Sequence, residues 1–70
     1  MRIIAERLKE LRLQKNLSIL ELSKNLGVSD ATICRWENGI SDIKSDDIIT
    51  ISNFFDVSAD YLIGLSNLQK

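Results

Sequence analysis

Few residues in this chain could carry catalysis or hold a metal ion. The sequence contains no histidine and one cysteine, Cys34. A single thiol without imidazole partners makes neither a usual zinc site nor an internal disulfide. Glu37 has no second acid or histidine at a fixed spacing, and the sequence shows no nucleophile–base pair and no phosphate-binding glycine-rich loop. We therefore expect no enzyme, no metal and no cofactor, and a reducing cytoplasm suits the free thiol.

The elements that must position the remaining polar residues are predicted to be helices. The 70 residues include 44% hydrophobic residues and no proline, and the three glycines fall where helices should end. No apolar run approaches the roughly 20 residues that a membrane span needs. The sequence predicts one all-α domain over residues 1–70, with helices at about 3–15, 19–26, 30–37, 46–55 and 59–63.

The clearest local signal is a pair of short helices joined by a tight turn. Ser18 and Glu21 have the spacing of a capping box, in which each side chain binds the other residue's backbone N–H. Gly27 suits the left-handed position after the first helix. Ser29 is the next N-cap, and Asp30 places negative charge in the first turn of the second helix. These residues predict a helix-turn-helix.

The second of these helices has one apolar face. Ile33 and Trp36 lie three residues apart and are expected to face the first helix. Trp36 could stack on bases, but its spacing from Ile33 favours a place in the core. Cys34 could be a redox switch beside Arg35, and the favoured interpretation is a small side chain on the helix surface.

The motif resembles the helix-turn-helix of the phage-repressor and Cro family, also called the XRE family. Similarity extends to both sides of the motif and covers almost the whole chain. The resemblance implies a compact five-helix lambda-repressor-like fold, whose second motif helix enters the DNA major groove. The residues that carry it are Leu17-Ser18-x-x-Glu21-Leu22-Ser23-x-x-Leu26-Gly27-Val28-Ser29-x-x-Thr32-Ile33-x-x-Trp36-Glu37-Asn38-Gly39.

The resemblance also implies which residues would read bases. The family reads mainly from the positions of Asp30, Ala31 and Arg35, and Thr32 is expected to be exposed on the same helix. Arginine can bind guanine O6 and N7, aspartate can accept from cytosine N4, and Ala31 or Thr32 could touch a thymine methyl group. For Asp30, compensation of the helix dipole is an equally good interpretation.

Other residues match positions that hold the domain together or anchor it to DNA. Arg12 and Glu37 match an arginine–glutamate pair that links the first and third helices in the family. Residues 1–44 carry eight basic and six acidic residues, and residues 45–70 carry one and four, so electrostatic affinity for DNA should be modest. The expected phosphate contacts are Ser18, Ser29, Asn38, Ser41 and Lys44.

Two residues depart from the family pattern. Ile19 stands where glutamine commonly contacts phosphate, and with Leu20 it makes an apolar spot near the expected DNA face. Ile43 stands where many relatives have proline, which predicts a looser loop before the fourth helix.

The expected function is sequence-specific binding of double-stranded DNA by a transcription regulator, as a repressor and as a homodimer. The first surface to consider for the dimer holds Phe54, Leu65 and Leu68.

Two alternatives use the same fold. The chain could be the antitoxin of a toxin–antitoxin pair, which binds DNA and a protein partner at Ile19 and Leu20 or at the C-terminal tail. It could also be a protein-interaction module with weak or no DNA binding, which the net charge of −1 and Ile19 would favour.

Overall fold

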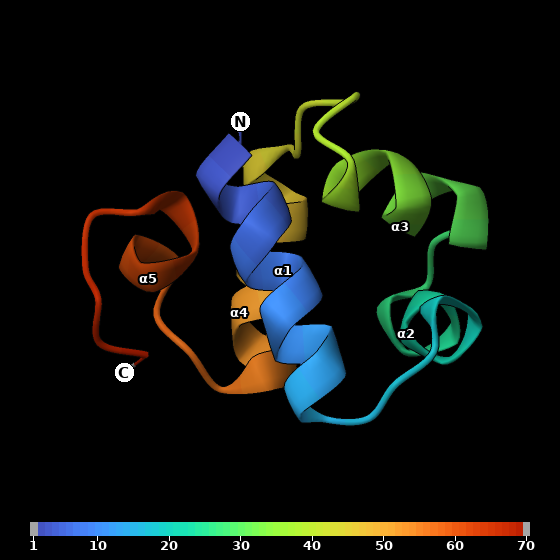
Figure 1. The fold of residues 1–70 in the computed structure, drawn as a ribbon, viewed down its shortest axis with the longest axis horizontal. Helices are drawn as coiled ribbons and strands as arrows, with labels where there is room; N and C mark the ends of the chain where they lie inside the picture. Colours follow the sequence, from blue (N-terminus) through green and yellow to red (C-terminus); the bar gives the residue numbers. More distant parts are fainter. Residues whose placement is uncertain (1, 70) are drawn as a thin grey trace.

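The computed structural model describes residues 2–69, which form five helices. α1 runs through the centre, with α4 behind it, α2 and α3 on one side and α5 on the other (Figure 1). This arrangement confirms the all-α, five-helix fold. The helices are α1 (Arg2–Gln14), α2 (Ile19–Leu26), α3 (Asp30–Glu37), α4 (Ser45–Phe55) and α5 (Ala59–Ile63).

The core lies where α1 meets the other helices. Ile4, Leu8 and Leu11 repeat along one face of α1 and are at most 3% exposed. Each of the other four helices contributes at least one fully or nearly fully buried apolar side chain to the same cluster. Because α1 contacts both α3 and α5, it is the element against which the helix-turn-helix is positioned. The largest fully buried side chains are Ile4, Leu8, Leu22, Ile33, Ile51 and Leu62.

Left-handed residues end three of the helices, and two of them are glycines at predicted helix ends. Gly27 ends α2 with φ 74°, and Asp56 ends α4 with φ 55° at the cost that a Cβ brings to this conformation. Gly64 ends α5 with φ 91°, and a Cβ there would lie 3.1 Å from Cγ1 of Ile3. A side chain at position 64 is therefore opposed both by the backbone conformation and by contact with α1.

α4 begins one residue before the predicted start at residue 46. Lys44 is the N-cap, with φ −69° and ψ 155°, and Ser45 is the first helical residue. The carbonyl of Lys44 accepts the Ile48 N–H at 2.9 Å, which closes the first turn one residue earlier than predicted. As a consequence, no side chain caps α4, whereas Ser18, Ser29 and Ser58 cap α2, α3 and α5.

Two apolar residues are more buried than predicted. Ile43 was expected to loosen the loop before α4, but it is 5% exposed and belongs to the core, so it anchors this loop. Phe54 was expected to be exposed for a dimer contact. It is half-buried, and its ring meets the ring of Phe55 edge-on with 4.9 Å between centroids.

Candidate nucleic-acid interface

The N-terminus of α2 is capped by side chains from its own first turn and N-cap. Ser18 Oγ accepts the Glu21 N–H at 3.0 Å, and Glu21 Oε1 accepts the Ser18 N–H at 2.9 Å. The bond from the Ser18 backbone lowers the pKa of Glu21, because it stabilises the charged carboxylate. This reciprocal pair is the predicted capping box. It also places a negative charge at the N-terminus of α2, where the helix dipole favours it.

The N-terminus of α3 is capped by a different set of hydrogen bonds. Ser29 Oγ accepts the Thr32 N–H at 3.2 Å and lies 2.8 Å from Thr32 Oγ1. Asp30 Oδ1 accepts the Ala31 N–H at 2.9 Å. The carboxylate of Asp30 therefore bends back onto the helix start, which favours the helix-dipole interpretation of this residue over a contact with cytosine.

α3 has an inner and an outer face. Ile33 and Trp36 are 0% and 5% exposed, which confirms that Trp36 belongs to the core and is not a stacking platform. Because a helix repeats every 3.6 residues, the opposite face carries residues at spacings of three, four and seven. This outer strip consists of exposed side chains on α3 and its C-cap, namely Ala31, Cys34, Arg35 and Asn38. Thr32 was expected on the exposed face but is half-buried.

An ion pair joins α3 to α1. Arg12 Nε and Nη2 donate to the Glu37 carboxylate at 2.7 and 3.1 Å, and Nη1 donates to the carbonyl of Leu17 at 2.9 Å. The two side chains are only 11% and 6% exposed. The hydrogen bond with Glu37 raises the pKa of Arg12. One planar guanidinium thus links α1, α3 and the connection before α2, and it positions the outer strip.

The expected phosphate contacts lie at helix starts and in the loop after α3. Ser18 and Ser29 are exposed but bound to their own helices. Asn38 donates from Nδ2 to the Cys34 carbonyl at 2.9 Å. Lys44 is exposed at the start of α4, and Ser41 is half-buried in the loop.

The expected apolar spot on α2 is only partly available. Ile19 is half-buried and packs against the core, whereas Leu20 is 54% exposed. Ile40, in the loop after α3, is 72% exposed and was not singled out from the sequence. The expected apolar spot is therefore made by Leu20 more than by Ile19, and Ile40 is a separate exposed apolar side chain.

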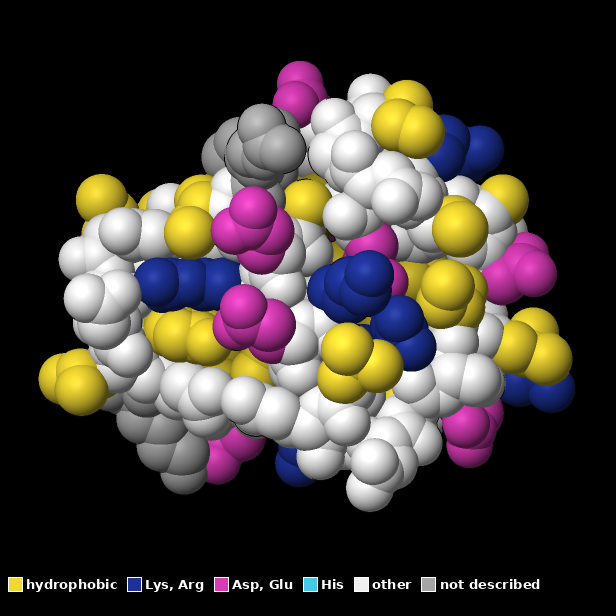
Figure 2. Space-filling view, viewed as in Figure 1, with side chains coloured by type: hydrophobic (Ala, Val, Ile, Leu, Met, Phe, Trp, Pro, Cys, Tyr) yellow, Lys and Arg dark blue, Asp and Glu magenta, His cyan; other side chains and the backbone are white. Residues whose placement is uncertain are grey.

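Charge is mixed over the surface. Figure 2 shows basic and acidic side chains interspersed on the face where α1 lies in front. This pattern agrees with the modest electrostatic affinity that the composition predicts.

Within residues 2–69, no group of three or more acidic or cysteine side chains is placed to hold a metal ion. The same part of the chain contains no helix with the length and apolarity to cross a membrane.

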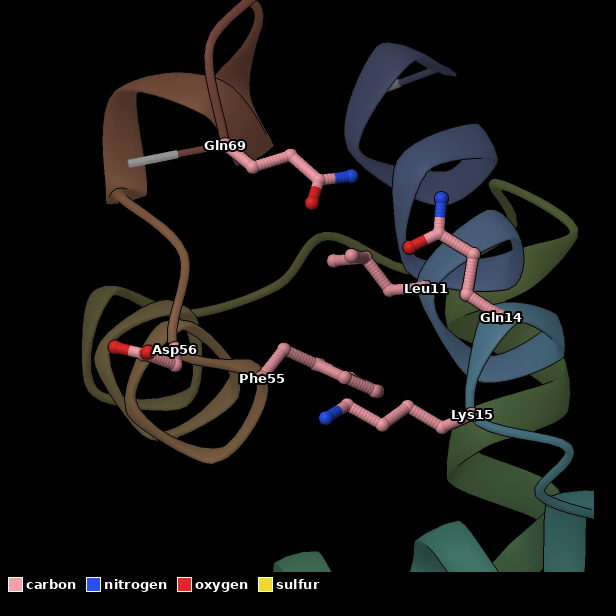
Figure 3. A pocket seen from close by; sticks show the side chains of 6 residues that line it. All are labelled: Leu11, Gln14, Lys15, Phe55, Asp56 and Gln69. Atoms are coloured by element: carbon pink, nitrogen blue, oxygen red, sulfur yellow. The ribbon is translucent and has the colours of Figure 1, made fainter.

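One pocket lies away from the outer strip of α3. It has a volume of about 460 Å³, and its lining comes from the end of α1, the end of α4 and the segment after α5 (Figure 3). Lys15 extends beside the Phe55 ring, and the side chain of Gln69 points toward α1. No residue of α2 or α3 lines this cavity, so it is not part of the candidate interface.

Sequence reasoning missed one long-range contact. Arg7 Nη1 donates to the carbonyls of Tyr61 and Ser66, and Nη2 donates to Asn67 Oδ1 at 3.0 Å. Its guanidinium also lies 4.2 Å from the centre of the Tyr61 ring. These partners are 54 to 60 residues away, so no local pattern in the sequence could have indicated them.

Together, two short helices with a tight turn, a buried inner face and an exposed outer strip define a helix-turn-helix domain. The model of the helix-turn-helix family matches residues 8–62, and the chain belongs to this family.

Comparison with solved structures shows which type of helix-turn-helix domain the chain resembles. The P22 c2 repressor in complex with a synthetic operator superposes with a TM-score of 0.80 at 26% identity, over 89% of this chain and 94% of the repressor chain. The solution structure of the P22 c2 repressor DNA-binding domain also gives a TM-score of 0.80 at 26% identity, over 87% and 80% of the two chains. These likenesses confirm a domain of the phage-repressor and Cro type.

Curated relatives are regulators of transcription. The chain is 28% identical to the HTH-type transcriptional regulator ImmR of Bacillus subtilis over 67 residues, which cover 96% of this chain and 53% of ImmR. It is 38% identical to the HTH-type transcriptional activator BcrR of Enterococcus faecalis over 58 residues, which cover 83% and 28% of the two chains. The chain thus spans about half of ImmR and less than a third of BcrR.

Proposed function

We propose that this chain regulates transcription in the cytoplasm by binding double-stranded DNA in a sequence-specific manner, with α3 in the major groove. The observation that carries the proposal is the exposed Arg35 on α3, opposite the buried Ile33 and Trp36. The likeness to a repressor bound to its operator supports the same docking. It also favours repression over activation, although one sequence relative is named as an activator.

Arg35 is the main base-reading residue in this proposal. It is the only basic side chain on α3, and it makes no hydrogen bond within residues 2–69 that would hold it to the protein. Its forked guanidinium suits guanine O6 and N7. Arg35→Ala should cost about 1–3 kcal/mol of binding free energy on the best duplex and relax the preference at one base pair per half-site.

The experiment first selects bound sequences from a random duplex pool. Affinities of the wild type and Arg35→Ala are then measured on the best duplex and on every single-base variant, at two salt concentrations. Lys44→Ala is the matched control, because loss of a phosphate contact should weaken all duplexes alike and reduce the salt slope by about one unit. A uniform loss for Arg35→Ala would refute base reading.

A homodimer is the second part of the proposal. One short helix with a single arginine offers few contacts, so tight binding calls for two α3 helices about 34 Å apart, one duplex turn. Leu65 and Leu68 are 76% and 72% exposed and remain the first surface to test, whereas Phe54 is half-buried. Footprinting should show two related half-sites, and a single footprint bound by one chain would contradict the dimer.

A second candidate function is protein binding, alone or together with DNA as in an antitoxin. Leu20 favours it, because this apolar side chain is 54% exposed at the start of α2. Salt dependence separates the candidates: DNA binding must weaken steeply as salt rises, because bound counterions are released from the duplex. If the chain shows no salt-dependent binding to any selected duplex, DNA binding is refuted and protein binding alone remains as the candidate function.

A further inference from the structure

The turn after α3 contains the one asparagine of the chain that is followed by glycine, in the pair Asn38-Gly39. The four other asparagines, at positions 16, 25, 53 and 67, are followed by leucine or phenylalanine. The amide carbon of an asparagine side chain can react with the backbone nitrogen of the next residue to form a cyclic imide. A side chain on that next residue hinders the reaction, so Asn38 is the asparagine of this sequence most prone to it.

The backbone of this turn is held by two hydrogen bonds. The Gly39 N–H donates to the Trp36 carbonyl at 3.2 Å, and the Ile40 N–H donates to the Arg35 carbonyl at 3.0 Å. With Gly39 at φ 70°, these are the two bonds of a Schellman motif. A Cβ built on Gly39 meets no atom within 4 Å, so the space beside this residue is open.

The side chain of Asn38 is exposed but restrained. Its Nδ2 donates to the Cys34 carbonyl at 2.9 Å, which turns the amide back along α3 and away from the nitrogen of Gly39. The second hydrogen of this NH2 group makes no hydrogen bond within residues 2–69. Ring closure therefore requires the bonds to Cys34 and Trp36 to open, and the ends of helices open more readily than their middles.

We propose, on the basis of the DNA-binding function above, that Asn38 is a site of spontaneous deamidation, that the modification weakens DNA binding, and that bound DNA protects the site. The Gly39 nitrogen bonds to Cγ of Asn38, the Cγ–Nδ2 bond breaks, and Nδ2 leaves as ammonia with the proton that Gly39 gives up. Water then opens the cyclic imide at either carbonyl, which leaves an aspartyl or an isoaspartyl residue.

Both products change what the end of α3 presents to DNA. Each replaces the NH2 donor of Asn38 with a carboxylate, and a negative charge at the C-terminus of a helix opposes the helix dipole and repels phosphate. The isoaspartyl product also adds one carbon to the backbone before Gly39. This displaces the two donors of the Schellman motif from their carbonyls on α3.

The first arm of the test detects the modification without DNA. The folded protein is incubated in mildly alkaline buffer, which favours loss of the Gly39 proton, and peptide mapping follows each asparagine. Asn38 should convert, with isoaspartate among the products, while the four other asparagines stay intact. Conversion should be slower than in the urea-unfolded chain, because the turn must open first. Asn38→Gln is the matched control, since its longer side chain does not form the five-membered ring.

The second arm measures the effect on binding to the best selected duplex. Asn38→Asp carries the charge of one product, so at low salt it should bind at least about fivefold more weakly, the factor for two unit charges about 4 Å apart in water. The loss should shrink as salt rises. Asn53→Asp adds the same charge on α4, outside the candidate interface, and should lose much less. During incubation the wild type should lose affinity in step with conversion, whereas Asn38→Gln should keep its initial affinity.

The third arm adds saturating duplex during the incubation, which should slow the conversion of Asn38. An intact Asn38 in the folded protein, under conditions that convert it in the unfolded chain, would overturn the modification site. Conversion without loss of affinity, or at the same rate with and without duplex, would overturn its link to DNA binding. Failure of the fresh protein to bind any selected duplex would overturn the proposed function itself, and the mapping of the first arm would still test the modification.

Discussion

Hydrogen bonds hold both the helix-turn-helix and the region after α5, but the bonds differ in how far apart their partners lie in the sequence. In α2 and α3, Ser18 and Ser29 bind backbone groups three residues away. The segment at 65–69 also has local bonds, such as those from the Leu65 and Ser66 N–H groups to the Asp60 carbonyl, but it is tied to α1 by Arg7, whose partners are 54 to 60 residues away. The helix-turn-helix is therefore held mostly by local hydrogen bonds, whereas the region after α5 also needs contacts that form only in the completed fold. Variants of the two kinds of contact should behave differently.

The largest effect is expected where the helix-turn-helix itself uses a long-range contact. Arg12→Ala or Glu37→Ala leaves a largely buried charge unpaired, so each should lower the free energy of unfolding by about 2–4 kcal/mol. The double variant should lose much less than the sum of the two single variants. Denaturant unfolding of all four proteins measures this coupling, and simple additivity would show that the pair contributes no interaction energy.

A smaller effect is expected for Arg7. Arg7→Ala removes hydrogen bonds to Tyr61, Ser66 and Asn67 from a half-buried site, and it should lower the free energy of unfolding by about 1–2 kcal/mol. Amide hydrogen exchange should rise in residues 64–68 and stay unchanged in α3. Arg7→Lys is the control that keeps the charge without the fork. Equal acceleration of exchange in α3 would contradict the separation of the two regions.

The serine caps should contribute about 1 kcal/mol each. Ser18→Ala should weaken α2 and Ser29→Ala should weaken α3, because each removes the acceptor for one backbone N–H. Ser41→Ala is a matched control, since Ser41 caps none of the helices in residues 2–69. Thermal unfolding measures all three, and a loss for Ser41→Ala as large as for the caps would point to a cause other than capping.

The smallest effect concerns pH. The folded pKa of Glu21 lies below its unfolded value, so its charge adds stability that is fully present above the unfolded pKa. This contribution is lost as the pH falls through the folded pKa. Glu21→Gln keeps a capping acceptor without the charge. The small advantage of the wild type over Glu21→Gln near neutral pH should therefore vanish in acid; an advantage that grows in acid would reverse the sign of the assignment.

The sequence predicted the parts that depend on local interactions. The bounds of α2, α3 and α5 match the prediction, because serine caps and left-handed glycines are encoded within a few residues. The start of α4 was predicted one residue late, because its N-cap is Lys44, whose side chain makes no capping hydrogen bond that a sequence pattern could indicate. Burial of Ile43 could not be read from its neighbours, because it depends on how the loop returns to the core.

The candidate site was predictable to a similar extent. The exposed positions of Ala31 and Arg35 follow from the period of the helix. The commitment of the Thr32 hydroxyl to Ser29, and of the Asp30 carboxylate to Ala31, depends on side-chain rotamers that a sequence pattern does not specify.

The division of labour on α3 has a consequence for how such a protein can change over time. Its framework bonds belong to Ser29, Asp30, Thr32 and Glu37, whereas the side chains of Ala31, Cys34 and Arg35 make no hydrogen bond within residues 2–69. Under the proposed function, replacing the latter three would alter what the helix recognises without removing a hydrogen bond on which the helix depends. New operators would then be accessible through single substitutions that selection for stability does not oppose, and the same positions are the ones to randomise when the domain is retargeted.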